Sequence, residues 1–373
     1  ATRSDIAIPD PDFKYPSLWK SNIAADYKFG DGWVATVELL YSKDINAIYH
    51  DNIGLYRTEQ FVNDGGAGNA RPYYNGYYSD REGNQKAANH VVMLRNTSKG
   101  HSLYTTFQLQ KNFVDGILKG LYLNGSYSFG QSRGVTDGTS SVATSAWKYR
   151  AALDGNAEEV GYTAGSFDGR LLLSASYTAN WSKYAATSFG LIYQRYRPFR
   201  YSYCYNGDAN GDSQFSNDLM YIPANFDEVK DHLLPGDFDS QEDAWKAMNA
   251  FIEQDPYLSK HRGEYAERNG AVAPFANQLD LSVSHDIKIY QKNGRSHTLR
   301  FSFNIANFLN LLNRNWGVVQ TTVLGNQQYQ FLTIPKGQGP SAANNYTLKY
   351  TMAKDLDETF KDNLNDVSRW QMQ

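Results

Sequence analysis

Apolar and polar residues alternate along nine segments of this chain, most of them roughly ten residues long. The clearest pair lies at 279–287 and 299–305. Odd positions such as Leu281 and Phe303 are apolar there, whereas the residues that follow them, Ser282 and Asn304, are polar. A period of two is typical of a β-strand with one apolar face, and the intervening YQKNGR is typical of a turn. The pattern predicts a hairpin.

The same alternation recurs along the rest of the chain. It predicts strands at 19–27, 33–41, 103–109, 121–129, 171–181 and 189–193, and residues 369–373 begin a ninth. About ten residues is the length that a tilted β-strand needs to cross a bilayer.

The connections between these segments alternate strictly between short and long. Short ones lie near 28–32, 111–119, 182–186 and 288–297, and long ones cover 42–101, 131–170, 198–277 and 307–367. Outer-membrane barrels have short periplasmic turns and long extracellular loops, whereas loops of this length are uncommon in a compact soluble domain. The spacing therefore favours an outer-membrane barrel.

We thus predict an all-β fold, namely a transmembrane antiparallel β-barrel with long extracellular loops. Residues 1–373 would form one portion of this barrel and would contain no plug domain. Segment 17–27 would run toward the periplasm, and so would the ninth segment. A bacterial barrel has an even strand count, and an open edge in lipid leaves backbone groups unsatisfied. We expect further strands to complete the barrel and the chain to stop within its last strand.

Composition excludes several other classes of protein. The chain has 373 residues, of which 41% are hydrophobic, but no long apolar run, which excludes helical membrane spans. Aromatic residues make up 14%, with 28 Tyr, which favours strands. The net charge is −3 and the basic residues are scattered, so we expect no nucleic-acid partner. The single cysteine, Cys204, cannot form an internal disulfide and is interpreted as a small strand residue.

Two groups of aromatic residues have a candidate function. The first lies near segment ends and in phase with the apolar face, which favours a girdle at the headgroups over a sugar-stacking platform. The second is the stretch RPYYNGYYSDREGN at 71–84, interpreted as a solvated, self-packed loop rather than a ligand contact. The girdle candidates are Trp19, Tyr27, Trp33, Tyr41, Trp181, Tyr193 and Trp370.

The sequence GDANGDSQFSND, which ends at Asp218, carries the strongest metal-like pattern. Asp208, Asn210 and Asp212 offer oxygen ligands at alternate positions, as in the first half of a calcium loop. Ser213 stands where an EF-hand has glycine, and Leu219 stands where it has glutamate. Asp, Asn and Gly also form ordinary turns. Ca²⁺ bound in the 208–218 loop is thus a hypothesis beside a plain turn.

This pattern lies in a predicted extracellular loop at 206–276, which also contains a predicted helix. Ser240 is a typical N-cap, and apolar residues follow it at helical spacing. We expect the apolar face of this helix to pack against the loop rather than to bind a partner. The apolar residues are Ala244, Trp245, Met248, Phe251 and Ile252.

No pattern indicates catalysis. The chain has no GxSxG, HExxH or phosphate-binding loop, and its seven histidines are spread singly. Asp280 and Asp286 fall on the polar face of their predicted strand, where charges line the lumen of a barrel. We expect no enzymatic activity.

Six segments together resemble the barrel of TonB-dependent receptors from Bacteroidetes and related bacteria, in particular the Oar-like branch. They are AIPDPDFKYPSLWKSNIAADYKF, ELLYSKDINAIYHDNIGL, GDANGDSQFSNDLMYIP, AERNGAVAPFANQLDLSVSHDI, FSFNIANFLNLLNRNWG and SRWQMQ.

The resemblance implies a 22-stranded barrel in the outer membrane of a Gram-negative cell, of which this chain would be the last nine strands. It implies as partners the protein's own earlier strands and plug domain, TonB, outer-membrane lipid and a surface lipoprotein. The implied function is TonB-dependent import of a nutrient or large ligand. A passive porin or structural outer-membrane protein, and a soluble carbohydrate-binding β-protein, are the alternatives.

Overall fold

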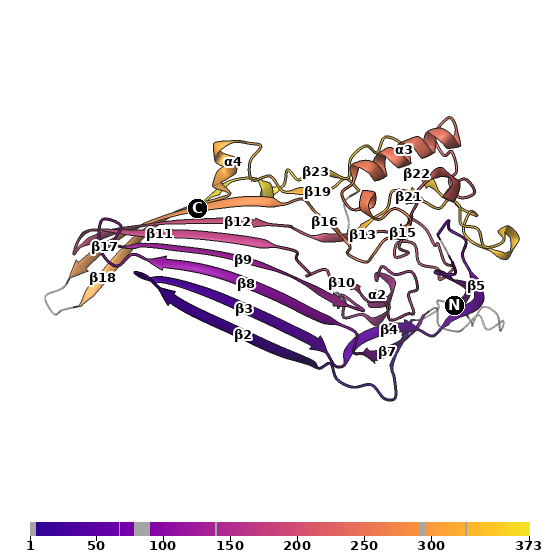
Figure 1. The fold of residues 1–373 in the computed structure, drawn as a ribbon, viewed down its shortest axis with the longest axis horizontal. Helices are drawn as coiled ribbons and strands as arrows, with labels where there is room; N and C mark the ends of the chain where they lie inside the picture. Colours follow the sequence, from indigo (N-terminus) through magenta and orange to yellow (C-terminus); the bar gives the residue numbers. More distant parts are fainter. Residues whose placement is uncertain (1–4, 67, 78–89, 139, 291–294, 325–326) are drawn as a thin grey trace.

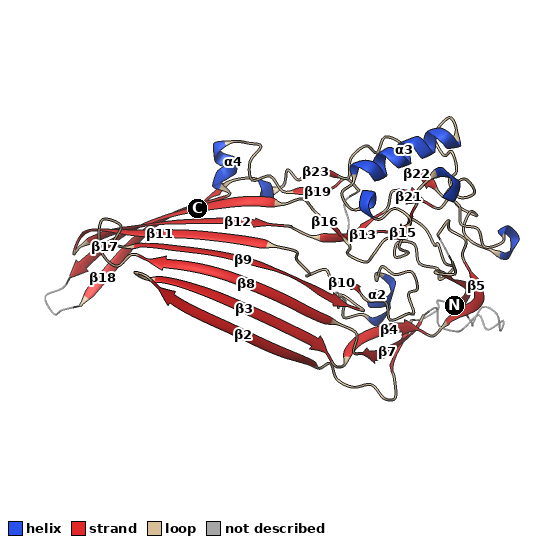
Figure 2. Ribbon diagram, viewed as in Figure 1, coloured by secondary structure: helices blue, strands red, loops and turns tan. Residues whose placement is uncertain are grey.

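The computed structural model describes residues 5–66, 68–77, 90–138, 140–290, 295–324 and 327–373. Its main element is one long antiparallel sheet, and its helices lie outside this sheet (Figures 1 and 2). Nine strands follow one another across the sheet in chain order, with the short β10 (Gly161–Tyr162) beside β9. The nine are β2 (Leu18–Phe29), β3 (Trp33–Asp44), β8 (His101–Asn112), β9 (Leu121–Gly134), β11 (Arg170–Ser182), β12 (Ala185–Tyr196), β17 (Ala276–Tyr290), β18 (Ser296–Ala306) and β24 (Gln371–Met372).

These strands lie where the alternation of apolar and polar residues predicts them. Three short turns join β2 to β3, β8 to β9 and β11 to β12. They lie at the end of the sheet where β17 ends and β18 begins, at the left of Figure 1. Of the predicted turn YQKNGR, residues 291–294 lie outside the described residues. The all-β class is confirmed. In the described sheet β2 and β24 are the two ends, and they do not pair with each other.

The register places all odd-numbered residues of the long strands on one face. Val37 pairs with Phe107, Leu173 pairs with Tyr193, and Val283 pairs with Phe303. Because directly paired residues in an antiparallel ladder project to the same side, the apolar positions of successive strands form one continuous surface.

The long connections form a second body at the other end of the sheet, at the right of Figure 1. We call it the loop domain and define it as the described residues among 45–100, 135–169, 197–275 and 319–362. Its larger strands are β4 (Ala47–Asn52), β5 (Leu55–Phe61), β6 (Pro72–Tyr77), β7 (Val91–Thr97) and β13 (Arg200–Tyr203), and β1 (Ile6–Pro9) pairs with β7. Its short strands are β14 (Tyr221–Ile222), β15 (Glu264–Tyr265), β16 (Ala271–Val272), β19 (Gln320–Thr322), β20 (Gln328–Tyr329), β21 (Leu332–Thr333), β22 (Thr351–Met352) and β23 (Phe360–Asp362).

Helices are few and short. The α-helices are α2 (Ala143–Lys148), α3 (Gln241–Gln254) and α4 (Phe308–Leu312), and the 3₁₀-helices are η1 (Phe226–Glu228), η2 (Leu258–Lys260), η3 (Ala342–Asn344) and η4 (Asp366–Ser368). Among the described residues, no helix combines the length and the apolar character that a membrane crossing requires.

Helix α3 lies where the helical spacing predicts it. Ser240 is its N-cap and accepts the backbone N–H of Asp243 at 3.1 Å. Met248 and Phe251 on its apolar face are buried in the main hydrophobic cluster of the loop domain. That cluster draws residues from all four long connections, for example Val62, Ala151 and Tyr350. The largest core of the molecule therefore lies in the connections and not in the sheet.

Candidate functional site

The odd face of the sheet is apolar and exposed. Trp19, Ile23 and Tyr27 on the edge strand expose 62%, 70% and 70% of their surface. A soluble protein rarely leaves so broad an apolar surface uncovered. The residues that expose more than a third of their surface on this face include Val37, Leu39, Tyr41, Leu103, Phe107, Leu109, Tyr127, Phe129, Leu173, Tyr177, Trp181, Phe189, Leu191, Ile287, Ile289, Leu299, Phe301 and Phe303.

Several of the predicted girdle residues lie at the ends of this face. Trp181 and Trp370 are exposed, and near the short turns Tyr27, Phe29 and Trp33 stack in a row with centroids 5.9 and 6.2 Å apart. The indole N–H of Trp19 donates to Ser21 at 2.6 Å. An aromatic ring that combines an apolar body with a hydrogen-bonded edge suits an apolar–polar boundary.

The even face is polar and carries hydrogen bonds from strand to strand. The amide of Gln108 donates to Asn124 at 2.7 Å, and Ser282 donates to Asn304 at 2.7 Å. Both carboxylates predicted on this face have partners. Asp286 accepts two hydrogen bonds from Arg300, at 2.6 and 2.7 Å, and Asp280 accepts the backbone N–H of Asn307, the residue before α4, at 2.8 Å.

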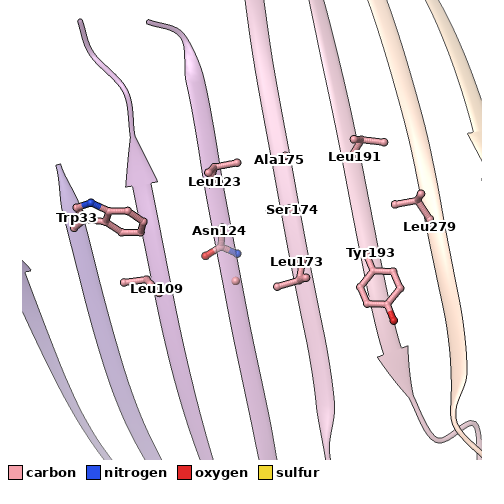
Figure 3. A pocket seen from close by; sticks show the side chains of 11 residues that line it. Trp33, Leu109, Leu123, Asn124, Leu173, Ser174, Ala175, Leu191, Tyr193 and Leu279 are labelled. Carbon is pink, nitrogen blue, oxygen red and sulfur yellow. The ribbon is translucent and has the colours of Figure 1, made fainter. Parts of the chain in front are cut away.

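Each face has a hollow beside a glycine residue. On the odd face a cavity of about 410 Å³ lies around Gly125, which is opposite Leu109 and Leu173 (Figure 3). On the even face a cavity of about 400 Å³ lies around Gly190, and Asp280 and Asn304 are among the residues that line it. Both hollows are mainly apolar, but the wall of the even-face hollow also contains the carboxylate of Asp280 and the amide of Asn304.

The predicted metal residues lie together in one turn of the loop domain, in which Asn210 and Asp212 are buried. Asp208 accepts the backbone N–H groups of Gly211 and Ser213 at 2.6 and 2.8 Å. Asn210 accepts the N–H of Asp212 at 2.9 Å, and its own amide lies 3.4 Å from the Asp212 carboxylate. Among the described residues, no group of three or more His, Cys, Asp or Glu side chains is arranged to hold a metal ion. The geometry is that of successive Asx turns.

This turn nevertheless concentrates negative charge. Burial raises the pKa of Asp208, and burial with the charges of Asp218 and Asp208 raises the pKa of Asp212 well above its ordinary value. Burial raises the pKa of Asp218 to about 7, although Arg71 opposes the shift. Ser213 has a φ of 66°, the left-handed conformation that the glycine of an EF-hand loop supplies. A cation would relieve the repulsion among these carboxylates.

Arg71, which the sequence patterns did not single out, joins this turn to the rest of the loop domain. Its side chain is fully buried and forms ion pairs with Asp64 and Asp218, each at 3.0 Å. It also donates to the backbone carbonyl of Leu219. Burial alone would lower the pKa of Arg71, but the carboxylates of Asp218 and Asp64 raise it. Arg71 therefore stays charged.

The Tyr-rich stretch divides into two parts. Residues 78–84 lie outside the described residues. In the described part, Tyr74 and Tyr77 are buried, and Tyr74 donates to Asp154 at 2.6 Å. The described part is packed, but against residues outside the stretch, because Asp154 belongs to the connection after β9. Solvation is wrong, because this segment pairs with the backbone of the metal-like turn, in which Asn210 accepts the N–H of Tyr74 at 2.7 Å.

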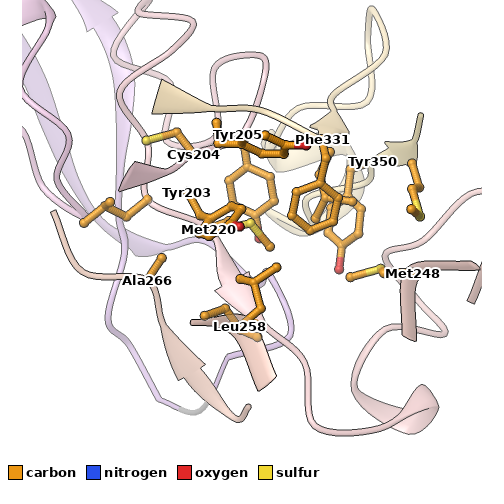
Figure 4. Packing of buried hydrophobic residues seen from close by; sticks show 14 of the residues in the cluster. Tyr203, Cys204, Tyr205, Met220, Met248, Leu258, Ala266, Phe331 and Tyr350 are labelled. Carbon is orange, nitrogen blue, oxygen red and sulfur yellow. The ribbon is translucent and has the colours of Figure 1, made fainter. Parts of the chain in front are cut away.

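Cys204 lies in the core of the loop domain beside Tyr203 and Tyr205 (Figure 4). It is fully buried, and burial raises the pKa of its thiol. A thiol of this kind is inert, because the nucleophile is the thiolate. Its role is packing, as predicted for a small residue, but it follows β13 and forms an isolated bridge with Leu219, so it is not part of a strand.

A scan against protein-family models found no match, and neither did searches of curated proteins and of solved structures.

Proposed function

We propose that the nine-strand sheet crosses the outer membrane as part of a β-barrel, with its odd face toward lipid and its even face toward the lumen. The observation that carries this proposal is the exposed apolar face, which runs unbroken across strands of 11 to 15 residues from β2 to β18. Strands of this length suffice to cross a bilayer at a tilt. In lipid, the open edges at β2 and β24 would require further strands.

The distribution of connections supports the same proposal. The three described short turns lie at one end of the sheet and the loop domain lies at the other. In a barrel, the short turns would face the periplasm and the loop domain would stand outside the cell, next to the mouth of the lumen. Tight packing of four connections into one core would give the outer surface a fixed shape.

We further propose that the complete protein is a TonB-dependent transporter similar to the Oar-like branch, which imports a nutrient or other large ligand. The six family-like segments support this proposal. The partners would be earlier barrel strands, a plug domain, TonB, outer-membrane lipid and a surface lipoprotein. The lumen would then be reached through the loop domain, and the polar even face would line it.

A matched pair of substitutions on β8 tests the barrel. Arginine at the membrane midplane costs about 2–4 kcal/mol when it faces lipid, and much less when it faces the lumen. We expect Phe107→Arg to lower the amount of folded protein in outer membranes severalfold, whereas Gln108→Arg leaves most of it in place. Equal effects of the two substitutions, or recovery of the full-length protein in the aqueous phase after detergent phase separation, would overturn the barrel.

Transport is tested with the full-length protein in cells. We expect uptake of candidate ligands to require both the proton gradient and TonB. Uptake that persists without TonB would indicate a passive porin. If the protein lies in the outer membrane but neither binds nor takes up any ligand, the transporter proposal fails while the barrel proposal stands.

A further inference from the structure

The apolar hollow on the odd face is built by the sequence of two neighbouring strands. Gly125 on β9 lies opposite Leu109 and Leu173, and Ala175 on β11 lies opposite Leu123. The missing and short side chains at positions 125 and 175 leave a cavity of about 410 Å³ (Figure 3). Its walls include Leu123, Leu173, Leu191 and Tyr193, all labelled in that view.

Two arginines lie just beyond this hollow, toward the loop domain. Arg195 pairs with Leu171, next to the pair of wall residues Tyr193 and Leu173 on the same face. Arg195 is two residues from Tyr193 along β12. Same-face residues in a strand are about 7 Å apart. Arg195 is therefore about 7 Å from the wall, on the same face, and β12 ends one residue later.

Arg195 and Arg197 share one aromatic ring. Their guanidinium carbons lie 4.5 and 4.1 Å from the ring centroid of Phe275, which is itself exposed. Burial lowers the pKa of Arg197, and the charge of Arg195 lowers it further. The two cations are thus held together against their mutual repulsion.

The carboxylates nearby do not neutralise this group. Arg197 lies 3.8 Å from Asp168, but Arg200 is also paired with Asp168. Among the described residues, Arg195 forms no ion pair, and the Nε of Arg197 is buried without a hydrogen-bond partner. Arg197 and Arg200 therefore share the single carboxylate of Asp168, and Arg195 has no carboxylate partner in the described part of the chain, so the group keeps an excess of positive charge that a further anion could neutralise.

We propose that this surface binds a phosphate-bearing lipid of the outer leaflet, with its phosphate on Arg195 and Arg197 and an acyl chain in the hollow around Gly125. The inference rests on the proposed membrane location of the sheet. Arginine forks match phosphate oxygens, and the leucine-lined hollow matches a hydrocarbon chain. A free phosphate ion would use the arginines but not the hollow, and a second copy of the chain would need no phosphate.

Native mass spectrometry of the full-length protein, purified from membranes in detergent, tests this inference. We expect wild-type protein to retain a phosphate-bearing lipid. The double variant Arg195→Gln/Arg197→Gln should reduce the retained fraction tenfold or more. Ala175→Phe, which fills the hollow, should also reduce it and leave binding of inorganic phosphate unchanged. The matched control is Arg170→Gln, which removes an exposed arginine from the even face at the same end of the sheet and should retain the lipid.

Equal lipid retention in the double variant and in Arg170→Gln would overturn the inference. Inorganic phosphate that displaces the lipid as well from Ala175→Phe as from wild type would indicate a free-anion site. If the wild type forms dimers that dissociate in the double variant, the surface binds a second copy of the chain rather than a lipid. If all variants migrate as heat-modifiable barrels but retain no lipid, only this inference fails. If the wild type is recovered in the aqueous phase, the membrane proposal fails with it.

Discussion

Arg71 and Asp218 form an ion pair at 3.0 Å between two different long connections, and both side chains are almost completely buried. Asp218 also accepts the backbone N–H of Ala209 at 2.8 Å, which places it at the base of the metal-like turn. One buried cation thus holds the connection after β3 against the connection after β12.

Removal of Arg71 should loosen the loop domain. Arg71→Ala leaves Asp64 and Asp218 buried without a counterion, and breaking a buried pair in this way costs about 3–5 kcal/mol. We expect faster amide hydrogen exchange in 62–77 and 204–222, with exchange in β8 and β17 unchanged. Lys246→Ala, which breaks an exposed pair with Asp243, is the control and should have no measurable effect. Unchanged exchange in Arg71→Ala would contradict a central role for this residue.

The metal-like turn should respond in opposite ways to two substitutions. At Gly211, with φ of 83°, an added Cβ would lie 2.0 Å from the carbonyl oxygen of Tyr74, so Gly211→Ala should destabilise the loop domain. Ser213 also has a positive φ, so Ser213→Gly should relieve about 1 kcal/mol of backbone strain and stabilise the loop domain. Thermal denaturation in detergent measures both. Stabilisation by Gly211→Ala would show that the turn has a different backbone.

His50 should make one acid-sensitive contribution to the stability of the loop domain. Burial lowers the pKa of His50, and the charge of Arg150 lowers it further. The unfolded chain therefore binds a proton at His50 that the folded chain does not, so the contribution of His50 to stability is full above the ordinary pKa of about 6.5 and is lost as pH drops below it. The raised pKa values of Asp212 and Asp218 act in the opposite direction. The slope due to His50 is at most about 1.4 kcal/mol per pH unit.

Denaturation midpoints between pH 8 and pH 5 measure this dependence. His50→Gln should remove the acid-induced loss that His50 causes, because glutamine does not titrate. An unchanged slope in His50→Gln would assign the effect to other groups.

Calcium should stabilise the loop domain if the 208–218 turn binds it. The carboxylates of Asp212 and Asp218 are buried, and the charges of Asp218 and Asp208 raise the pKa of Asp212. Calcium at a hundredfold excess over its Kd would add about 2.7 kcal/mol of stability. We expect a higher melting temperature in millimolar Ca²⁺, lost in Asp212→Asn. Asp227→Asn, which changes an exposed carboxylate in the same connection, should keep the response. Identical melting temperatures in Ca²⁺ and in chelator would contradict calcium binding and would favour a plain turn.

The main sheet could be predicted because its determinants are local. A period of two in residues such as Leu279, Leu281 and Val283 needs no knowledge of the partner strand, and the short turns leave few choices of neighbour. Helix α3 is predictable for the same reason, since Ser240 and the spacing of Met248 and Phe251 act within one segment.

The interior of the loop domain could not be predicted in this way. Arg71 lies 147 residues from Asp218 in the chain, and its sequence neighbourhood, rich in Tyr and Asn, resembles a solvated loop. Ion pairing between residues so far apart in the chain produces no periodic pattern in the sequence. Arg195 and Arg197 were missed because two spaced arginines acquire meaning only beside Phe275 and the hollow around Gly125.

The sequence by itself thus determined the strands, their alternating faces and the sorting of short and long connections, because each depends on neighbours a few residues apart. The tertiary structure decided that the long connections share one core, that Arg71 is charged at its centre, and that an apolar hollow adjoins a cationic pair. These features arise when distant segments exclude water together, and the cost of an unpaired buried charge then selects the partners.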